Sequence, residues 1–234
     1  MKLIFLQGTI TNGSEAVADS TAIADGVKEV SVLELLMDGG WYIMIPLALL
    51  SIIAIYIFVE RTLAIQGALK AEKNFMMKIK DYIRDNKLDS ARNLCETTKT
   101  PIARMIGKGI ARIGKPLKDI STSIENIGKL EIYALEKNLN VLATISGAAP
   151  MIGFLGTVIG MVQVFVQMEA AGSVEVEDIS AGTKQAMITT IVGLIVGIIA
   201  YMAYNFLVGR VSKVIHKMEA TSIEFIDILE EPGK

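Results

Sequence analysis

Hydroxyl side chains and a proline interrupt two long apolar segments of this 234-residue chain. Thr157 and Thr190 lie well inside these segments, and Pro150 leaves the backbone carbonyl of Ser146 without its helical donor. Such groups can line a wet path through a membrane. Two alternatives stay open, since each hydroxyl can bond back to the carbonyl four residues earlier and the proline can simply kink its helix.

Small residues recur at helical spacing around these groups and form one face on each segment. Such faces let two helix backbones approach closely, and the spacings Gly156 to Gly160 and Gly193 to Gly197 are both GxxxG. The residues predicted to pack helices are Gly153, Gly156, Gly160, Gly193, Gly197 and Ala200.

Asp, Glu, Lys, Arg and His are absent from the apolar segments 41–59, 138–168 and 185–209. The single histidine, His216, lies beyond them next to Lys217, so this chain alone cannot build a proton relay. The sequence also lacks a glycine-rich phosphate loop, a metal-binding cluster of His and Cys, and a serine nucleophile with partners. It therefore predicts no enzyme, no catalytic residue, no cofactor, no metal site and no nucleic-acid partner.

The three apolar segments are each long enough to cross a bilayer, and the mean hydropathy of +0.48 agrees. We therefore expect an all-α membrane protein with three transmembrane helices. Residues at the membrane boundaries are Trp41, Glu60, Arg61 and Arg210. The expected organisation is an outside, partly disordered segment with a short interfacial helix (1–37), a first span (38–60), a cytoplasmic helical domain (61–137), a second span (138–168), a short outside loop (169–183), a third span (184–209) and a cytoplasmic helix (210–234).

The flanking charges predict the orientation, because Lys and Arg concentrate on the cytoplasmic side of short loops. They cluster in 60–137 and 210–234, whereas the other side has Lys28 and Lys184 near the spans. The N-terminus is therefore expected outside and the C-terminus in the cytoplasm. No signal peptide is expected, since Leu3 to Leu6 is too short an apolar run.

Apolar residues at helical spacing predict helices in the cytoplasmic domain, with breaks near Asn86, Thr100-Pro101 and Gly114-Lys115-Pro116. A helix starting near Leu117 is expected to run unbroken into the second span, and the first span to extend beyond Arg61. The single cysteine, Cys95, cannot form an intramolecular disulfide and is expected to be a small buried or neutral residue.

Several segments of the chain resemble a known family of membrane proteins. They are Gly39-Gly40-Trp41, Pro46-Leu47, Ser51, Glu60-Arg61, Ala149-Pro150-Met151-Ile152-Gly153-Phe154-Leu155-Gly156-Thr157-Val158-Ile159-Gly160-Met161, Gly182, Ala186, Thr190, Gly193-Leu194 and Tyr204-Asn205. Together they are similar to the MotA/TolQ/ExbB proton-channel family and most similar to its ExbB branch, over roughly residues 38–210.

The resemblance implies a homopentamer in the bacterial inner membrane, around a single-span partner similar to ExbD or TolR that carries a membrane Asp. Spans two and three would line the pore, with Thr157 and Thr190 near the partner's carboxylate. The implied function is to couple the proton-motive force to a TonB-like protein for outer-membrane transport. A TolQ-like role in envelope constriction, a passive scaffold and a self-contained channel are the alternatives.

One residue departs from the family pattern. ExbB-like sequences often have a Glu where this chain has Gln185, at the start of the third span. Gln cannot titrate, so the resemblance predicts that the partner's Asp suffices and that Gln185 contributes to the proton path only by hydrogen bonding. The missing acid also leaves room for an ion other than the proton, although the sequence suggests no oxygen-rich sodium site.

Overall fold

Helices form all the regular structure in the part of the chain that the computed structural model describes, residues 40–69, 74–171 and 176–230. They are α3 (Trp41–Leu69), α4 (Phe75–Arg84), α5 (Leu88–Thr97), α6 (Pro101–Ile110), α7 (Leu117–Glu136), α8 (Leu139–Ala171) and α9 (Val176–Glu230). The interfacial helix and disorder expected in residues 1–37 lie outside the described residues.

Within the described residues, three helical stretches are long and apolar enough to cross a membrane, namely Trp41–Leu69, Leu117–Ala170, which contains α7 and α8, and Ile179–Glu230. The described part of the chain is therefore all-α, as predicted, with three candidate membrane-spanning stretches. The helices also continue beyond the apolar runs, since α3 passes Arg61 by two turns and α9 passes Arg210 by more than five. α8 ends at Ala171 and α9 begins at Val176, so helix extends into both ends of the segment 169–183 that the sequence predicts as a loop.

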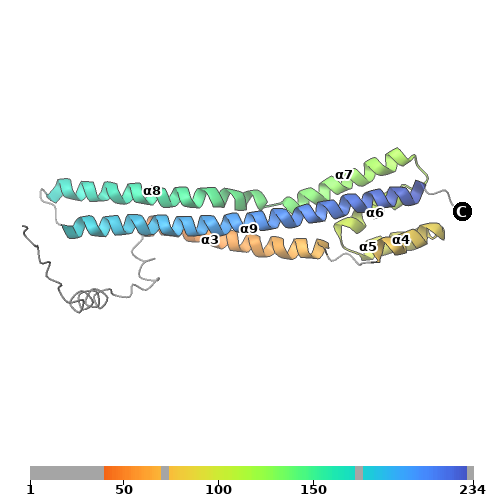
Figure 1. The fold of residues 1–234 in the computed structure, drawn as a ribbon, viewed down its shortest axis with the longest axis horizontal. Coiled ribbons are helices and arrows are strands. Elements are labelled where there is room, and N and C mark those ends of the chain that lie inside the picture. The colour runs from red at the N-terminus through yellow and green to blue at the C-terminus, as the bar shows by residue number, and fades with distance from the viewer. Residues whose placement is uncertain (1–39, 70–73, 172–175, 231–234) are drawn as a thin grey trace, which may run out of the picture. The chain divides into compact units, whose positions relative to one another are not determined.

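The long helices α8 and α9 lie side by side and share the most extensive contact of the fold (Figure 1). α3 packs against both, and α7 packs against the later part of α9. The short helices α4, α5 and α6 contact one another in sequence, and α4 and α6 also contact α9. α9 is therefore the element to which most of the others attach.

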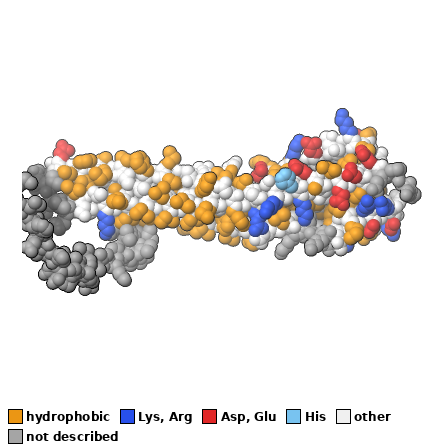
Figure 2. Space-filling view, viewed as in Figure 1, with side chains coloured by type: hydrophobic (Ala, Val, Ile, Leu, Met, Phe, Trp, Pro, Cys, Tyr) orange, Lys and Arg blue, Asp and Glu red, His pale blue; other side chains and the backbone are white. Residues whose placement is uncertain are grey.

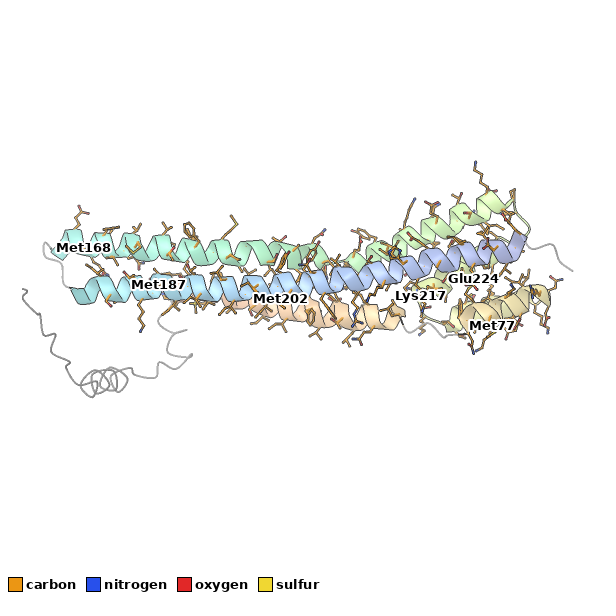
Figure 3. All side chains as sticks on the ribbon, in the orientation of Figure 1. Met77, Met168, Met187, Met202, Lys217 and Glu224 are labelled. Carbon is orange, nitrogen blue, oxygen red and sulfur yellow. The ribbon has the colours of Figure 1, made fainter. Side chains whose placement is uncertain are left out.

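The surface divides into an apolar and a charged part (Figure 2). Hydrophobic side chains cover α8 and the part of α9 beside it, while Lys, Arg, Asp and Glu gather over α4 to α7 and the end of α9. Met187 and Met202 lie on the apolar stretch of α9, and Lys217 and Glu224 on its charged stretch (Figure 3). This division matches a molecule that is partly in lipid and partly in water.

The predicted helix breaks are confirmed. Asn86 has a φ of 55° between α4 and α5, and Gly114 has a φ of 95° between α6 and α7. Thr100 caps α6, because its hydroxyl accepts a hydrogen bond from the amide of Ala103 at 3.3 Å, and Pro101 takes the first helical position.

The expectation of an unbroken helix from Leu117 is wrong. α7 ends at Glu136 and α8 begins at Leu139, with Asn138 between them at a φ of 65°. Asparagine tolerates this left-handed conformation better than most residues, so a helix can end there without glycine or proline.

One hydrophobic core runs through the charged part of the fold and into the apolar part. Ile106 of α6, Ile124 of α7 and Phe225 of α9 meet there without solvent exposure. Gly109 permits this approach, since a Cβ at its position would lie 2.8 Å from both Ile124 and Phe225. Cys95 belongs to the same core and is buried with a free thiol, as expected.

Candidate functional site

The contact between α8 and α9 is closest at a pair of glycines. A Cβ on Gly193 would lie 2.6 Å from the carbonyl oxygen of Ala149 and 2.9 Å from the Cα of Gly153. A Cβ on Gly153 would in turn lie 2.9 Å from the carbonyl oxygen of Thr189. The two backbones therefore touch here, and only glycine fits on either side.

The same close packing continues in both directions along the helices. A Cβ on Gly160 would lie 2.9 Å from the Cβ of Ala186, and Gly156 faces the side chain of Thr189 without room for a Cβ. At the other end Gly197 lies against the ring of Pro150, and Ala200 is fully buried. The structure therefore places the five glycines of the predicted packing faces where α8 and α9 pack together, whereas Ala200 is buried and lines a groove between α3 and α9.

The carbonyl that Pro150 leaves free lies against α9. The oxygen of Ser146 is 3.1 Å from the position that a Cβ on Gly197 would take, so the absence of a side chain there makes room for it. A Cα–H donor facing a carbonyl supplies a weak hydrogen bond. The Ser146 hydroxyl itself donates to the carbonyl of Ala143 at 2.7 Å.

The hydroxyl of Thr190 crosses between the two helices. It donates to the carbonyl of Gly153 at 2.9 Å, and the side chain is half-buried. The hydroxyl of Thr157 instead donates to the carbonyl of Phe154 in its own helix at 2.6 Å. Thr157 therefore follows the local bonding alternative, although the acceptor is three residues earlier and not four.

Thr189 is a site residue that the sequence reasoning missed. Only 1% of it is exposed, and its hydroxyl donates to Ala186 at 2.7 Å while lying 3.5 Å from the carbonyl of Gly153. Its spacing of three from Ala186 and four from Gly193 was a signal that it shares their face.

Gln185 lies where α3 begins. Its side-chain amide contacts the backbone of Gly40, where a Cβ would have no room and where φ is 70°. The carbonyl of Gly40 accepts the first helical bonds of α3, from the amides of Ile43 and Met44. Gln185 therefore links the early part of α9 to the start of α3.

The predicted boundary residues occupy different environments. The ring of Trp41 is exposed and lies edge-on to Tyr42, with centroids 5.1 Å apart, while the guanidinium of Arg210 stacks over Phe206 at 4.9 Å. Arg61 pairs with Glu60 and is only 7% exposed, which is unusual for an arginine at the end of an apolar run.

A groove between α3 and α9 is separate from the hydroxyls. Its volume is about 450 Å³, and Ser51 is its one polar side chain, the others being Ala54, Ile55, Phe58, Val196, Ile199, Ala200, Met202, Ala203 and Phe206. None of the residues predicted for the proton path lines it. Among the described residues, moreover, no three His, Cys, Asp or Glu side chains come together as a metal site would require.

Taken together, the α8–α9 contact offers hydroxyl oxygens and backbone carbonyls but no group that titrates near neutral pH. Hydroxyl oxygens can both accept and donate a hydrogen bond, so they can stabilise a carboxyl in either protonation state. The site therefore offers hydrogen-bonding groups but no side chain of its own that exchanges a proton near neutral pH.

Comparison with known proteins gives several relatives with transport names. The Biopolymer transport protein ExbB of Aquifex aeolicus is 37% identical over 102 residues, which cover 43% of this chain and 69% of that protein. The Tol-Pal system protein TolQ of Haemophilus influenzae is 37% identical over 84 residues, covering 36% of this chain and 37% of that protein. The Putative biopolymer transport protein ExbB-like 1 of Synechocystis is 27% identical over 204 residues, covering 86% and 80%.

A family model described as the MotA/TolQ/ExbB proton channel family matches residues 97–220, from the end of α5 through most of α9. Proteins of this family are membrane transport proteins and not enzymes. Because the match covers just over half of the chain, and includes the hydroxyl and glycine residues of the α8–α9 contact, this chain belongs to the MotA/TolQ/ExbB proton channel family.

Proposed function

We propose that this chain is the pore-forming subunit of a proton-driven motor in the bacterial inner membrane. Five copies would surround a single-span partner similar to ExbD or TolR, whose membrane helix carries an Asp. The assembly would couple the proton-motive force to a TonB-like protein for outer-membrane transport. The relatives named ExbB support the ExbB-like reading over other roles in the family.

The observation that carries the proposal is a site with hydrogen-bonding groups but no titratable one. Thr157 and Thr190 lie in apolar helices without Asp, Glu, Lys, Arg or His in the apolar segments. A proton cannot be held there unless another chain supplies an acid. A carboxyl from a partner helix would find hydroxyl oxygens on both α8 and α9.

The two threonines would contribute differently to that carboxyl. Thr157 donates within its own helix, so its hydroxyl can turn toward an ionised carboxylate at the cost of one local bond. Thr190 donates across to Gly153, so turning it would also weaken the helix contact. We therefore assign Thr157 as the donor to the ionised carboxylate and Thr190 as an acceptor from its protonated form or from water.

Proton movement down the membrane potential would supply the work. One proton releases about 2.3 kcal/mol per 100 mV of potential. Repeated neutralisation of the partner's Asp would change which subunit of the ring it faces, and so rotate one assembly inside the other. In this arrangement the N-terminus would be periplasmic, and α4 to α7 with the end of α9 would be cytoplasmic.

Native mass spectrometry of the chain, gently extracted from its own membrane with any bound subunits, tests the proposal. Five copies that retain a smaller single-span protein with a membrane Asp are the expected result. A monomer or dimer that is stable to mild extraction and lacks such a partner would contradict it and favour a passive membrane scaffold.

A TolQ-like role in envelope constriction is the second candidate, supported by the TolQ relative. The two roles differ in the protein that receives the work, and not in the pore. Identification of the periplasmic protein that co-purifies with the assembled complex distinguishes them.

A further inference from the structure

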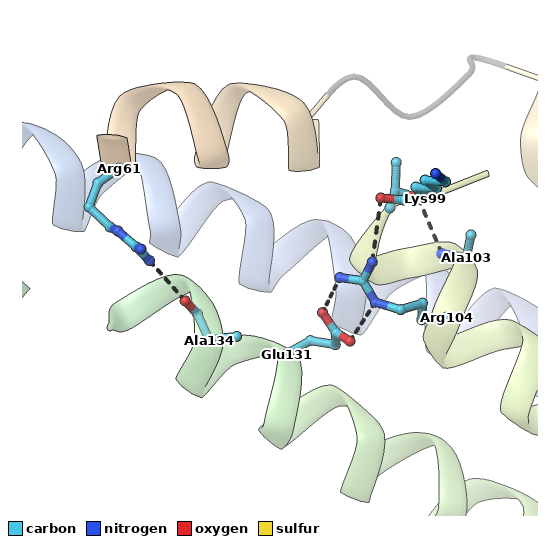
Figure 4. Close-up of polar contacts among 7 residues, drawn as sticks. Arg61, Lys99, Ala103, Arg104, Glu131 and Ala134 are labelled. Carbon is cyan, nitrogen blue, oxygen red and sulfur yellow. Dashed lines mark hydrogen bonds and ion pairs between the residues drawn. The ribbon is translucent and has the colours of Figure 1, made fainter. Parts of the chain in front are cut away.

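Arg61 is a buried cation that the proposed proton path does not use. It lies on α3 directly after the apolar run, yet its side chain is only 9% exposed. Nη1 donates to the carbonyl of Ala134 in α7 at 3.1 Å (Figure 4). Nη2 pairs with Glu60, and Nε has no hydrogen-bond partner. Burying a guanidinium in this way is costly, which calls for a compensating role.

The acceptor of this bond belongs to a helix end. α7 ends at Glu136, so the amide four residues after Ala134 is that of Asn138, which has left the helix at a φ of 65°. The last carbonyls of a helix lack partners within it and carry the negative end of its dipole. A guanidinium is a well-suited donor to such a group, because it supplies both a positive charge and a fixed N–H direction.

The break that Arg61 supports stands directly before α8. Asn138 directly precedes α8, and its carbonyl accepts from the amides of Val141 and Leu142 at 3.2 and 3.4 Å. Leu142 is fully buried in the core that α3 and α9 share. The junction therefore ties three elements together: the end of the α3 apolar run, the end of α7 and the start of α8.

We propose that Arg61 is a positioning residue that fastens α3 to the C-terminus of α7 and thereby fixes the direction in which α8 leaves the break. Any effect of Arg61 on proton flow rests on the proposed function, because α8 carries Thr157. The effect of Arg61 on the junction is independent of the proposed function. A lipid-facing boundary arginine would instead be exposed to the headgroups, and lysine would replace it fully.

Hydrogen exchange of the assembled complex tests this proposal on Arg61→Met and Arg61→Lys. Arg61→Met keeps an unbranched side chain like the apolar stem of arginine and leaves no unpaired buried charge, because Glu60 is partly exposed. We expect peptides covering 134–142 to exchange about tenfold faster, since a charge-assisted bond is lost, while 158–165 and the number of copies stay unchanged. Arg61→Lys should recover part of the protection, because an ammonium can still reach Ala134 but cannot bond to Ala134 and Glu60 through two fixed N–H groups as the guanidinium does.

Arg210→Met is the matched control, because Arg210 also ends an apolar run but its guanidinium stacks on Phe206 of its own helix. Unchanged exchange at 134–142 in Arg61→Met, or the same change in Arg210→Met, would overturn the proposal. Full recovery by Arg61→Lys would also overturn it and assign a simple boundary charge. The two proposals can fail separately. If Arg61→Met changes the exchange at 134–142 but the unmodified complex conducts no protons, the proposed function is refuted and the role of Arg61 at the junction remains.

A second pair of variants decides the question if Arg61→Met does not fold. Asn138→Gly keeps access to a positive φ, whereas Asn138→Leu disfavours it. Faster exchange at 134–142 in Asn138→Leu but not in Asn138→Gly is the expected result. Equal exchange in the two variants would mean that the break does not set the direction of α8, and the proposal would fail.

Discussion

At the scale of single residues, Thr157 and Thr190 differ in the acceptor of their hydroxyl hydrogen bond, which lies in the same helix for Thr157 and in the neighbouring helix for Thr190. Thr157→Val preserves side-chain shape and removes only a bond within α8, so assembly and thermal stability should stay near those of the unmodified chain. Proton flux through the complex should fall about tenfold, the value of one hydrogen bond of about 1.4 kcal/mol. Flux measured with a pH-sensitive dye in vesicles checks this expectation.

Thr190→Val should lower both flux and stability, because its hydroxyl bonds across to Gly153 at 2.9 Å. Loss of an interhelical bond of this kind costs about 0.6 to 2 kcal/mol in a membrane. Thr157→Ser and Thr190→Ser restore the hydroxyls and serve as controls. Normal flux in both valine variants would remove the hydroxyls from the mechanism and favour a passive scaffold.

Gln185 allows a test of whether this chain itself must supply an acid. Gln185→Glu would place a carboxylate beside Gly40 at the N-terminus of α3, where the helix dipole favours negative charge. We expect flux and proton-driven function to stay unchanged, because in the proposed motor the Asp of the partner supplies the acid. Gly40→Ala, which has no room for its Cβ, controls for disturbed packing at the same place. If Gln185→Glu by itself abolished or restored proton-driven function, the acid or amide at position 185 would have to take part directly in proton transfer.

Cys95 has a thiol that should resist reaction. Burial, followed by the charge of Glu96, raises its pKa from an ordinary value of 9.0 to about 12. The thiolate fraction at pH 8 is then lower by about a thousandfold, and alkylation should be correspondingly slow until the protein unfolds. Because the folded pKa is raised, this thiol's contribution to stability is complete below pH 9 and is lost as the pH approaches 12.

Mass spectrometry after iodoacetamide treatment, with and without denaturant, measures the alkylation. Equal labelling in the two states would contradict the burial of Cys95. Thermal unfolding between pH 8 and 11 compares Cys95→Ala with the unmodified chain. The variant has no thiol to ionise, so its stability should fall less as the pH rises.

At the scale of elements, the glycine contact between α8 and α9 should dominate the stability of the apolar part. Gly193→Ala places a methyl group 2.6 Å from a backbone oxygen, where no rotamer can relieve the clash, so it should destabilise by about 1 to 3 kcal/mol or more. Gly209→Ala in the same helix meets nothing within 4 Å and should be neutral or stabilising by about 0.5 to 1 kcal/mol. Thermal unfolding in detergent distinguishes the pair, and equal losses would contradict the close contact.

The elements show which parts of the fold are local properties of the sequence. Breaks at Asn86, Pro101 and Gly114 could be predicted because those residues restrict or permit particular backbone angles. The break at Asn138 could not, since good helix formers surround it and the contact with Arg61 of another helix supports it. Thr189 was missed for a related reason. Thr189 and Thr190 are neighbours in the sequence, so their side chains point about 100° apart around α9, and the position of α8 decides which of the two is buried.

At the scale of the whole molecule, the spans and their small faces could be read from the sequence, because lipid restricts which residues a spanning helix can contain. The depth of Arg61 could not, since it depends on where α3 crosses α7. The proposed ring of five copies, and the acid proposed at its centre, likewise depend on contacts between chains that one sequence does not contain. Only the chemistry missing from the chain indicates that a partner is needed.

That missing acid gives the last prediction. The purified chain, reconstituted alone in vesicles with a potassium diffusion potential, should move no protons, because its apolar segments contain no Asp, Glu, Lys, Arg or His. Addition of the single-span partner should produce flux, and a partner with Asn in place of the membrane Asp should not. Flux from the chain alone would identify a self-contained channel and would require water held by Thr157, Thr190 and backbone carbonyls to conduct without an acid. Flux that persisted with the Asn partner would have the same consequence, because an amide cannot accept and release a proton at neutral pH.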